Sequence, residues 1–564
     1  MNKRINLLRK KFKKYNIDGY IVSKNDDYFT EYSKINRLEI ISNFTGSAGL
    51  AIILKNKNFL FTDGRYTIQS QMESGKNFKI ISYDKIINFD LVKNLTLGID
   101  PKLFTYEQIK KFFLKNNKIK FIEKNLIDEI KNKKIKDNFQ FFSLKKEIVG
   151  ESSKSKINKI AKYLKKNKSD YLLVSAPENV AWILNIRGGD GPNSPVPNSR
   201  LIISKTKKIF LISKIHKTKR LIKDKIIKSK EVIDINNFHQ EIVKLNGKNF
   251  IIDNKSCSIF YEDIIKSKFK IVKREDPTYL LKSVKNKTEI NNTIKSHIID
   301  GVALTKFIYW IKNINKKKIT EVEAQNKLEK FRKMNKNYLY PSFDTIAGSG
   351  ENGAIVHYRA KKENCRTINT KDIFLCDSGG QYKYGTTDVT RTICFSKPKS
   401  QIKNIFTKVL KGHIAVANTN LKKDNTGKKI DARARKFLNK SNLDYAHGTG
   451  HGVGFFLNVH EGPQAITKIN SIKIKEGMIL SNEPGYYQKG KFGIRIENLV
   501  FVKKNKNKLF FENLTLAPIE KDLINYKLLS SKEKNYLFKY HLGVYSKISK
   551  FLNPNERKWL ASFI

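Results

Sequence analysis

The chain has 564 residues, of which 40% are hydrophobic and 11% aromatic, a composition that is typical of globular proteins and excludes a disordered one. This length is too great for one hydrophobic core and predicts about three domains. The chain contains 111 lysines and arginines against 52 aspartates and glutamates, which gives a formal net charge of +59. Such a charge could attract nucleic acid or an anionic membrane surface. The lysines, in runs such as 132–136 and 315–318, form no basic stripe interleaved with aromatic residues, so we interpret the charge as a solvated surface and expect neither partner.

The four cysteines suggest a reducing compartment, because they show no paired metal-ligand spacing and are too few for a disulfide framework. The first ten residues carry charge but lack the apolar core of a signal peptide. No window approaches the roughly 20 apolar residues of a membrane span. We therefore expect a cytoplasmic protein that does not enter a membrane.

The first segment predicts an α/β domain. An amphipathic helix pattern that includes Leu7, Leu8 and Phe12 precedes a strand at 20–23. Two further apolar strands flank the polar stretch 55–58 and predict a hairpin. The second of these strands runs into Arg65, which is either a salt-bridged corner or a ligand contact. The local sequence favours the corner.

A second copy of this pattern follows in the chain. Residues 5–23 align in register with residues 157–175, and in both copies a lysine-rich helix is followed by an aspartate (Asp18 and Asp170) and a strand. Chance similarity between lysine-rich helices is an alternative, but the shared strand endings favour two tandem α/β domains of one type. The second copy continues through a Pro- and Gly-rich loop at 191–197 into two more strands.

The second half of the chain begins with a long helix. A polar joint near 283–287 leads into the capping pattern of residues 286–289, and isoleucines then recur on one helical face. From there to about Pro518, glycine-rich turns and strands dominate. The tail, from the capping pattern at 530–533 to Trp559, predicts one more helix with an apolar stripe that packs on its own domain.

Candidate metal ligands gather in this second half. The stretch 373–393 predicts strand, turn and strand, with Asp377 on one arm and Asp388 on the other. The glycine-dense motif 447–454 contains His447 and His451, and its glycines indicate a close approach of the backbone. Two more strand-like runs carry acids, Glu483 and Glu497.

Each of these residues alone is more simply a turn cap or a hydrogen-bonded loop residue, but together they point to a metal site. Four carboxylates in one core repel one another unless several cations are present, and the obvious basic residues nearby are only Arg391 and Arg495. Two divalent ions would supply four positive charges. The oxygen-rich ligand set suits Mn²⁺, Co²⁺, Fe²⁺ or Zn²⁺. A pair of ions can share and ionise one water, which is hydrolase chemistry.

These motifs resemble the pita-bread metallopeptidases, the family that includes methionine aminopeptidase, prolidase and aminopeptidase P. The resemblance is to the large, three-domain cytosolic Xaa-Pro aminopeptidases and covers nearly the whole chain. It is carried by the stretches 44–49, 62–66, 181–188, 377–392, 447–454, 458–463 and 483–498 and by the tail around Trp559. It implies an α/β and α+β fold, with creatinase-like α/β domains at 1–145 and 146–283, a pita-bread catalytic domain at 284–520 and a C-terminal helical extension at 521–564.

The resemblance also implies the metal site. Two divalent ions are expected, with Mn²⁺ preferred and Co²⁺, Fe²⁺ or Zn²⁺ as alternatives, and Asp388 and Glu497 would bridge them. A hydroxide between the ions would attack the carbonyl carbon of the Xaa-Pro bond. The implied ligands are Asp377, Asp388, His451, Glu483 and Glu497.

Roles for other residues follow from the same resemblance. Glu483 would carry the proton to the leaving nitrogen and His460 would donate to the oxyanion, with His357 as a third catalytic group. Arg65 would reach the peptide, which replaces the corner salt bridge as its implied role. Arg495 would contact a ligand carboxylate. The histidines expected to contact the substrate are His357, His447, His451 and His460.

The implied function is removal of the N-terminal residue from peptides with proline in second position, by a cytoplasmic homodimer. A prolidase-type dipeptidase with the same metal site is the nearest alternative, and two tandem domains favour the aminopeptidase, since such enzymes accept longer peptides. A non-enzymatic pita-bread protein that binds histones or nucleic acid is another alternative, and the charge of +59 gives it some weight. The complete ligand set argues against this alternative and against metal-free, creatinase-like hydrolases.

Overall fold

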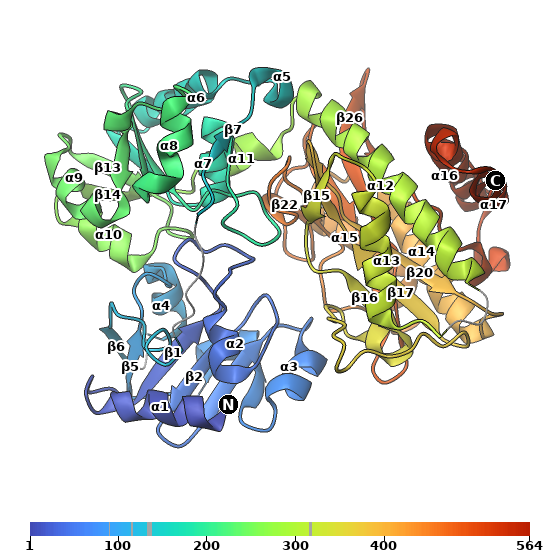
Figure 1. Ribbon diagram of the computed structural model, residues 1–564, viewed down its shortest axis with the longest axis horizontal. Coiled ribbons are helices and arrows are strands. Elements are labelled where there is room, and N and C mark those ends of the chain that lie inside the picture. Colours follow the sequence, from blue (N-terminus) through green and yellow to red (C-terminus); the bar gives the residue numbers. More distant parts are fainter. Residues whose placement is uncertain (90, 114–116, 132–137, 315–317) are drawn as a thin grey trace. The chain divides into compact units, whose positions relative to one another are not determined.

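The computed structural model describes residues 1–89, 91–113, 117–131, 138–314 and 318–564 (Figure 1). The chain divides into two compact units, Met1–Tyr279 and Leu280–Ile564. The lysine runs at 132–136 and 315–317 lie outside the described residues. Among the described residues, none of the helices combines the length and the apolarity needed to cross a bilayer.

The first half of unit 1 is a six-stranded sheet with the order β4-β3-β2-β1-β5-β6. Strand β1 is antiparallel to β2 and parallel to β5, and β2 and β3 form the predicted hairpin. The predicted helix is α1 (Asn2–Phe12), which buries Ile5, Leu8 and Phe12, whereas Leu7 of the same apolar pattern is 39% exposed. The strands are β1 (Gly19–Ser23), β2 (Leu50–Leu54), β3 (Asn58–Thr62), β4 (Lys79–Ser82), β5 (Thr96–Ile99) and β6 (Lys118–Phe121).

The second half of unit 1 repeats this topology, with the order β12-β11-β10-β8-β13-β14. Strand β8 is antiparallel to β10 and parallel to β13, as β1 is to β2 and β5, and helix α6 (Ser153–Lys166) precedes β8 as α1 precedes β1. The prediction of two tandem domains of one type is therefore confirmed. The strands are β8 (Tyr171–Val174), β10 (Arg200–Ser204), β11 (Ile209–Ser213), β12 (Val232–Asp234), β13 (Asn249–Ile252) and β14 (Lys270–Lys273).

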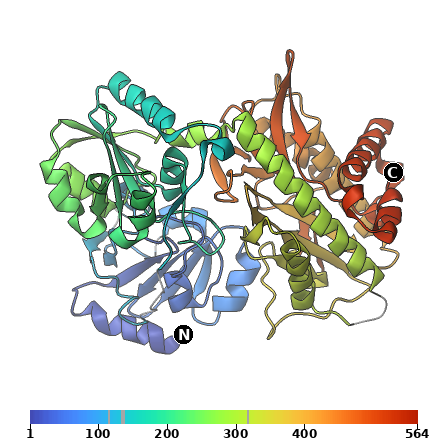
Figure 2. The same ribbon diagram turned by 45° about the horizontal axis from the view of Figure 1, so that its top comes forward.

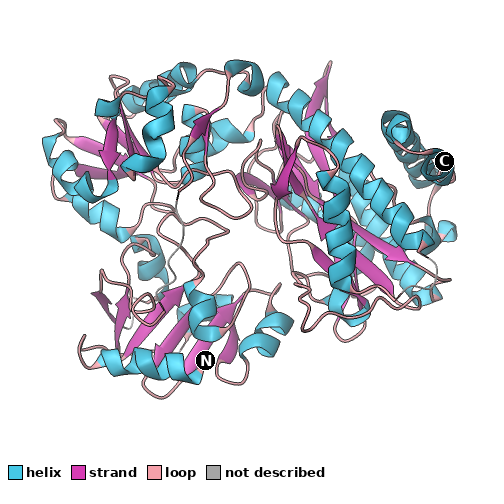
Figure 3. Cartoon of the chain, viewed as in Figure 1, coloured by secondary structure: helices cyan, strands magenta, loops and turns pink. Residues whose placement is uncertain are grey.

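Helices accompany both sheets of unit 1 (Figure 3). A short two-stranded ladder of β7 (Phe142–Ser143) and β9 (Ile186–Arg187) lies outside the two large sheets. The remaining helices are α2 (Arg37–Ser42), α3 (Thr67–Ser74), α4 (Tyr106–Phe112), α5 (Lys146–Val149), α7 (Pro177–Leu184), α8 (Ile215–Lys223), α9 (Phe238–Lys244), α10 (Ile259–Lys266) and α11 (Thr278–Ser283), and α11 leads into unit 2.

The two aspartates of the repeat perform the same task. Asp18 accepts a hydrogen bond from the backbone N–H of Thr96, at the start of β5, and pairs with Lys55 in the hairpin turn. Asp170 accepts from the backbone N–H of Asn249, at the start of β13, and pairs with Lys205. Each aspartate therefore ties a strand start to a hairpin, which explains why the residue recurs in register.

Unit 2 begins with the long helix that the sequence predicts, α12 (Lys287–Asn313), and its capping box of Asn286 and Glu289 is present. In the described residues up to Pro518 there are three further helices, which the sequence pattern did not predict: α13 (Glu321–Lys333), α14 (Ser400–Ala417) and α15 (Gly427–Asn439). The predicted tail helix is two helices, α16 (Ser531–Ile548) and α17 (Pro554–Ala561). Asn553 caps α17 and Pro554 occupies its first turn, so the chain starts a new helix there.

Within the described part of unit 2, the strands form three sheets and one isolated hairpin. One sheet has the order β16-β17-β20, a second β15-β18-β19, and the largest β22-β21-β23-β26-β27. The strands are β15 (Tyr338–Pro341), β16 (Ile346–Ser349), β17 (Ile373–Ser378), β18 (Gly380–Tyr382), β19 (Gly385–Thr386), β20 (Val389–Cys394), β21 (Gly450–Gly452), β22 (Glu461–Ile466), β23 (Ile479–Asn482), β26 (Asn498–Asn505) and β27 (Lys508–Asn513), with β24 (Gly485–Gln488) and β25 (Phe492–Arg495) as the isolated hairpin.

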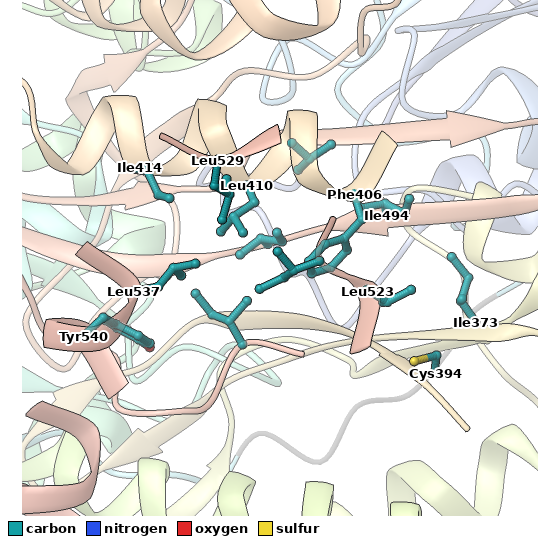
Figure 4. Packing of buried hydrophobic residues seen from close by; sticks show 14 of the residues in the cluster. Ile373, Cys394, Phe406, Leu410, Ile414, Ile494, Leu523, Leu529, Leu537 and Tyr540 are labelled. Atoms are coloured by element: carbon teal, nitrogen blue, oxygen red, sulfur yellow. The ribbon is translucent and has the colours of Figure 1, made fainter. Parts of the chain in front are cut away.

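Strands β17 and β20 lie between two helical layers. Helices α12 and α13 lie alongside each other (Figures 1 and 2) and pack Leu304 and Leu328 against Phe374 of β17. On the other side, Ile373 and Cys394 join a cluster with α14 and α16, part of which is shown in Figure 4. Because side chains alternate along a strand, the face that carries Ile373 also carries Asp377.

Candidate active site

The hairpin of β17 and β20 places two acids on one face. Asp377 lies directly opposite Thr390 in the antiparallel ladder, and alternation puts Asp388 on the same face as Thr390. Both aspartates are buried, at 7% and 4% exposure. The turn between the strands carries β18 and β19, which join β15 in a separate sheet. The predicted strand–turn–strand is therefore confirmed.

Other acids and a histidine meet this face. Ligand atoms of Asp388, His451 and Glu497 all lie within 4.8 Å of one another. His451 Nε2 is 3.4 Å from Asp388 Oδ2 and 3.5 Å from Glu483 Oε1. The structure thus brings together residues that lie up to 109 positions apart in the chain, between Asp388 and Glu497.

Asp377 has an unusual environment for a buried acid. Its Oδ2 accepts a hydrogen bond from Arg495 Nη2 at 2.6 Å, whereas its Oδ1 is buried without a hydrogen-bond partner. Burial raises the pKa of Asp377 to about 6, against the opposing charge of Arg495 and with a further contribution from Asp388. Burial and the charges of Asp388 and Glu483 hold the pKa of Glu497 well above its usual range. The cluster has more buried negative charge than Arg495 balances, and an oxygen-rich donor set of this kind fits divalent cations.

Backbone interactions place the two glutamates. Glu483 follows β23, and its N–H donates to the carbonyl of Thr449 at 2.8 Å. Glu497 lies between β25 and β26; its N–H donates to the carbonyl of Thr390, and the hydroxyl of Thr390 donates to its carboxylate at 2.7 Å. Backbone hydrogen bonds therefore fix Glu483 to the residue before β21 and Glu497 to β20.

His451 depends on the glycines that surround it. A Cβ on Gly450 would overlap the carbonyl oxygen of Ser481, and one on Gly452 would overlap that of Glu461. Only glycine therefore allows β21 to lie this close to its two neighbours, as the glycine density of the motif predicted. His451 Nδ1 donates to the carbonyl of Gly452, which leaves Nε2 directed at the acids. Burial lowers its pKa, but the hydrogen bond to Asp388 and the charge of Glu483 outweigh this and raise it to about 9.

Arg495, Tyr487 and His447 form a hydrogen-bonded chain beside the acids. Arg495 Nη1 donates to the Tyr487 hydroxyl at 2.6 Å, and that hydroxyl lies 2.8 Å from His447 Nε2. His447 Nδ1 faces the carbonyl of Gly448 and must carry the proton, so the Tyr487 hydroxyl donates to Nε2. Burial lowers the pKa of His447 to about 4 and raises that of Tyr487 to about 12. Arg495 thus contacts a candidate ligand, Asp377, while Tyr487 had no predicted role.

Two candidates of unit 2 remain, and one of them, His460, lies beside His451. The His460 ring centroid lies 4.2 Å from that of His451, at an interplanar angle of 76°. His357 is half-buried and lies in a turn that follows a 3₁₀ helix, Gly350–Ala354. That helix packs closely on β25, because a Cβ on Gly493 would overlap the carbonyl of Gly353.

Arg65 belongs to unit 1, where it pairs with Asp63. Its Nε donates to Asp63 Oδ1 at 2.9 Å and its Nη2 to Oδ2 at 2.8 Å, and the guanidinium lies over the Tyr66 ring. The corner salt bridge that the local sequence favoured is thus present.

Comparison with known proteins identifies the class of fold. Residues 291–504 match metallopeptidase family M24, and residues 507–562 match the C-terminal region of peptidase M24. The creatinase/prolidase N-terminal domain matches twice, at 4–129 and at 133–289. The pita-bread fold with two creatinase-like domains before it is therefore confirmed.

Relatives that align with nearly the whole chain indicate a narrower class of protein within this fold. A probable Xaa-Pro aminopeptidase P of Laccaria bicolor is 36% identical over 593 residues, which cover 99% of this chain and 92% of that protein. Xaa-Pro aminopeptidase 1 of Dictyostelium discoideum is 36% identical over 610 residues, covering 100% and 96%. The crystal structure of the X-prolyl aminopeptidase of Caenorhabditis elegans, described as a cytosolic enzyme with a di-nuclear active site, has a TM-score of 0.92 and 28% identity over 100% of this chain and 99% of that one.

The chain therefore belongs to metallopeptidase family M24. The full-length relatives named above are Xaa-Pro aminopeptidases, so the chain is a hydrolase, and the non-enzymatic alternative is set aside.

Proposed function

We propose that this hydrolase is a metal-dependent Xaa-Pro aminopeptidase, which removes the first residue from peptides with proline in second position. The observation that carries the proposal is the buried cluster of Asp388, His451 and Glu497, with Glu483 beside it and the unpartnered oxygen of Asp377 on the same hairpin face. The full-length likeness to Xaa-Pro aminopeptidases supports the choice of substrate.

The proposed metal site uses the five residues that the sequence singled out. Asp377, Asp388, His451, Glu483 and Glu497 would hold two divalent ions, with Mn²⁺ preferred over Co²⁺, Fe²⁺ and Zn²⁺ for this oxygen-rich set. When bound, the ions supply a nucleophilic water at neutral pH and polarise the scissile carbonyl.

The chain's own groups would move the protons. Glu483 lies between two histidines, with one carboxylate oxygen 3.5 Å from His451 Nε2 and the other 3.9 Å from His447 Nδ1. A carboxylate in this position can accept a proton from water and pass it to the leaving nitrogen. His460, next to the His451 ring, would donate to the developing oxyanion, and His357 is proposed as a third catalytic group.

Substrate recognition would rest on groups around the cluster. His357, His447, His451 and His460 are the proposed contacts in unit 2, and Arg65 is proposed to reach the peptide from unit 1. Arg495 would hold Asp377 and, through Tyr487, orient His447. The Xaa-Pro bond is a tertiary amide without an N–H, so a site that recognises it cannot depend on that donor.

The organisation of the protein completes the proposal. We propose domain boundaries at 1–145, 146–283 and 284–520, with residues 521–564 as a helical extension of the catalytic domain. The described location of the C. elegans neighbour supports a cytoplasmic enzyme. A homodimer is proposed from the resemblance in sequence.

Peptide length and metal content test the proposal together. Purified protein treated with a chelator should lose activity and regain it with Mn²⁺, and it should release the first residue of bradykinin-like Xaa-Pro tripeptides. Activity confined to Xaa-Pro dipeptides would instead support the prolidase-type alternative. If no Xaa-Pro peptide is cleaved with Mn²⁺, Co²⁺, Fe²⁺ or Zn²⁺, the proposal is contradicted.

A further inference from the structure

A buried ion cluster lies directly beside His460. Its centre is Glu461, the next residue in the chain and the first of β22. Lys282 Nζ donates to Glu461 Oε2 at 2.9 Å, and Lys285 Nζ pairs with Oε1. None of the three side chains is more than 3% exposed.

Such a cluster is better suited to fixing geometry than to adding stability. Removing ionised groups from water costs nearly as much as their attraction returns, so a buried ion pair contributes little net free energy of folding. Moving one partner out of place, however, leaves an unpaired buried charge, which is strongly unfavourable. Glu461 is therefore confined to the position that satisfies both lysines.

The two lysines are themselves held by backbone contacts. Val284, between them, forms an isolated β-bridge with Met478, and the N–H of Lys285 donates to the carbonyl of Gly477 at 3.0 Å. Lys285 also directly precedes Asn286, the N-cap of α12. The ammonium groups thus project from a segment anchored to the start of β23 and to the first turn of the long helix.

The position of Glu461 determines the course of the loop that carries His460. The backbone of Glu461 pairs with Gly452, immediately after His451, and the loop between them closes with a hydrogen bond from the Gly454 N–H to the Asn458 carbonyl at 3.0 Å. A Cβ on Gly454 would lie 3.2 Å from Glu461 Oε2, so the carboxylate packs directly on the loop. At the tip, Gln381 Nε2 donates to the carbonyl of Leu457.

We propose that Lys282, Lys285 and Glu461 are positioning residues for the hydrolysis, because they fix the returning end of the 452–461 loop and thereby hold His460 against the His451 ring. The inference rests on the proposed function, since it requires His460 to act on the substrate. The same contacts connect the segment in which unit 1 passes into unit 2 with an active-site loop.

The Glu461→Gln variant tests this role, because it keeps the shape of the side chain but removes its charge. An oxyanion donor is worth about 10²–10³ in kcat, so a displaced one should lower kcat by about 10-fold or more and leave KM within about 2-fold. Metal content should not change, because no proposed ligand is altered. Lys411→Met is the matched control: it breaks the Lys411–Glu533 pair of the same unit, away from this loop, and should leave both constants unchanged.

A double-mutant cycle with His460→Ala separates positioning from general loosening of the fold. If Glu461 acts through His460, Glu461→Gln has no further effect on the residual kcat of His460→Ala. An equal loss of kcat in both backgrounds, or unchanged kinetics of Glu461→Gln alone, would overturn the inference. If Glu461→Gln does not fold, Lys282→Met, which keeps the Lys285–Glu461 pair, replaces it in the same cycle. A wild-type protein inactive on every Xaa-Pro peptide would instead overturn the proposed function, and this inference with it.

Discussion

The Tyr487 hydroxyl contacts two groups with different proposed roles, since Arg495 binds the proposed metal ligand Asp377 and His447 is a proposed substrate contact. We predict that Tyr487→Phe lowers kcat/KM by about 10-fold, because the change leaves a guanidinium N–H and an imidazole nitrogen buried without partners, at a cost of about 1–3 kcal/mol. Steady-state kinetics on an Xaa-Pro tripeptide measure the effect.

The neighbouring tyrosine offers a matched control. Tyr486 lies in the same strand and packs its ring against Phe492. Tyr486→Phe should change kcat/KM by less than about 2-fold, the range expected of a substitution away from such a network. Equal losses for the two variants would indicate that the strand as a whole, and not the Tyr487 hydroxyl, is responsible.

Asp276 of unit 1 predicts a pH effect on stability that is independent of the active site. Burial raises the pKa of this carboxyl to about 6, above its ordinary value near 3.8. The native state therefore binds the proton more tightly than the unfolded state, and its stability falls as pH rises from about 4 to about 6. Asp276→Asn does not titrate, so its melting temperature relative to wild type should increase over this range and stay constant above about pH 7.

Differential scanning fluorimetry between pH 4.5 and 7.5 measures this difference. Asp522→Asn is the control. The side chain of Asp522 is exposed, and pairing with Lys312 lowers the pKa of its carboxyl, although burial opposes this. Its melting temperature relative to wild type should not rise between pH 4.5 and 6. A difference for Asp276→Asn that is independent of pH would contradict the assignment.

Some residues of the site could be predicted from sequence and others could not. Asp377, Asp388, His451, Glu483 and Glu497 each lie in a short stretch of strand-like or glycine-rich sequence, so the local pattern itself marks them. Tyr487 and Glu461 lie in the same motifs, but their importance comes from partners distant in the chain. Lys282 is 179 positions from Glu461, and no local pattern indicates that the two will meet.

Among the structural elements, β21 has a sequence that is tightly constrained by its two neighbouring strands. We predict that Gly450→Ala abolishes metal binding and activity, because its Cβ would overlap the Ser481 carbonyl and force β21, with His451, away from β23. Metal analysis of the purified variant and a peptidase assay test this outcome.

A second glycine substitution controls for the change in residue type. Gly543 lies within α16, and nothing stands within 4 Å of a Cβ placed there. Gly543→Ala should raise the free energy of unfolding by up to about 1 kcal/mol, because alanine favours the helix, and should leave activity unchanged. A Gly450→Ala protein with normal metal content would show that β21 can move without loss of the site.

The errors in predicting elements have identifiable causes. In α14 the buried residues Ile405, Val409 and Leu410 recur at helical spacing, and this signal could have predicted the helix. The tail illustrates the opposite case: its apolar residues continue across 549–553 with no break in pattern, and only the capping sequence at Asn553 and Pro554 indicates two helices. Leu7 directly precedes Leu8, and neighbouring residues lie about 100° apart around a helix. Leu7 therefore falls outside the buried stripe of Ile5, Leu8 and Phe12, which explains its exposure.

At the scale of the whole molecule, the division into two compact units predicts separate responses to metal. All five proposed ligands lie in unit 2, so Mn²⁺ should raise only the melting transition of that unit. At 100 times the dissociation constant the stabilisation is about 2.7 kcal/mol. Differential scanning calorimetry of the full chain with chelator and with Mn²⁺ measures both transitions.

Asp388→Asn is the control, because it removes a proposed ligand and should abolish the shift while leaving the unit 1 transition in place. An equal upward shift of both transitions would contradict the assignment of the metals to unit 2 alone.

The repeat in unit 1 could be recognised in the sequence because Asp18 and Asp170 perform one task in two copies. The packing of unit 2 could not be predicted from the sequence, because it depends on contacts between segments that are distant in the chain.

Arg391 links helix α16, near the end of the chain, to the backbone of the proposed metal ligand Glu497. Its guanidinium is fully buried and donates to the carbonyls of Glu497 and Ala517 and to the hydroxyl of Tyr540, in α16. A protein shortened before α16 would lose that hydroxyl and the helix that covers the guanidinium, and a cation would become hydrated directly behind a proposed metal ligand. Helix α16 therefore supports the proposed metal site from behind, through Arg391. Substitutions in the terminal helices should be tested for effects on catalysis as well as on stability.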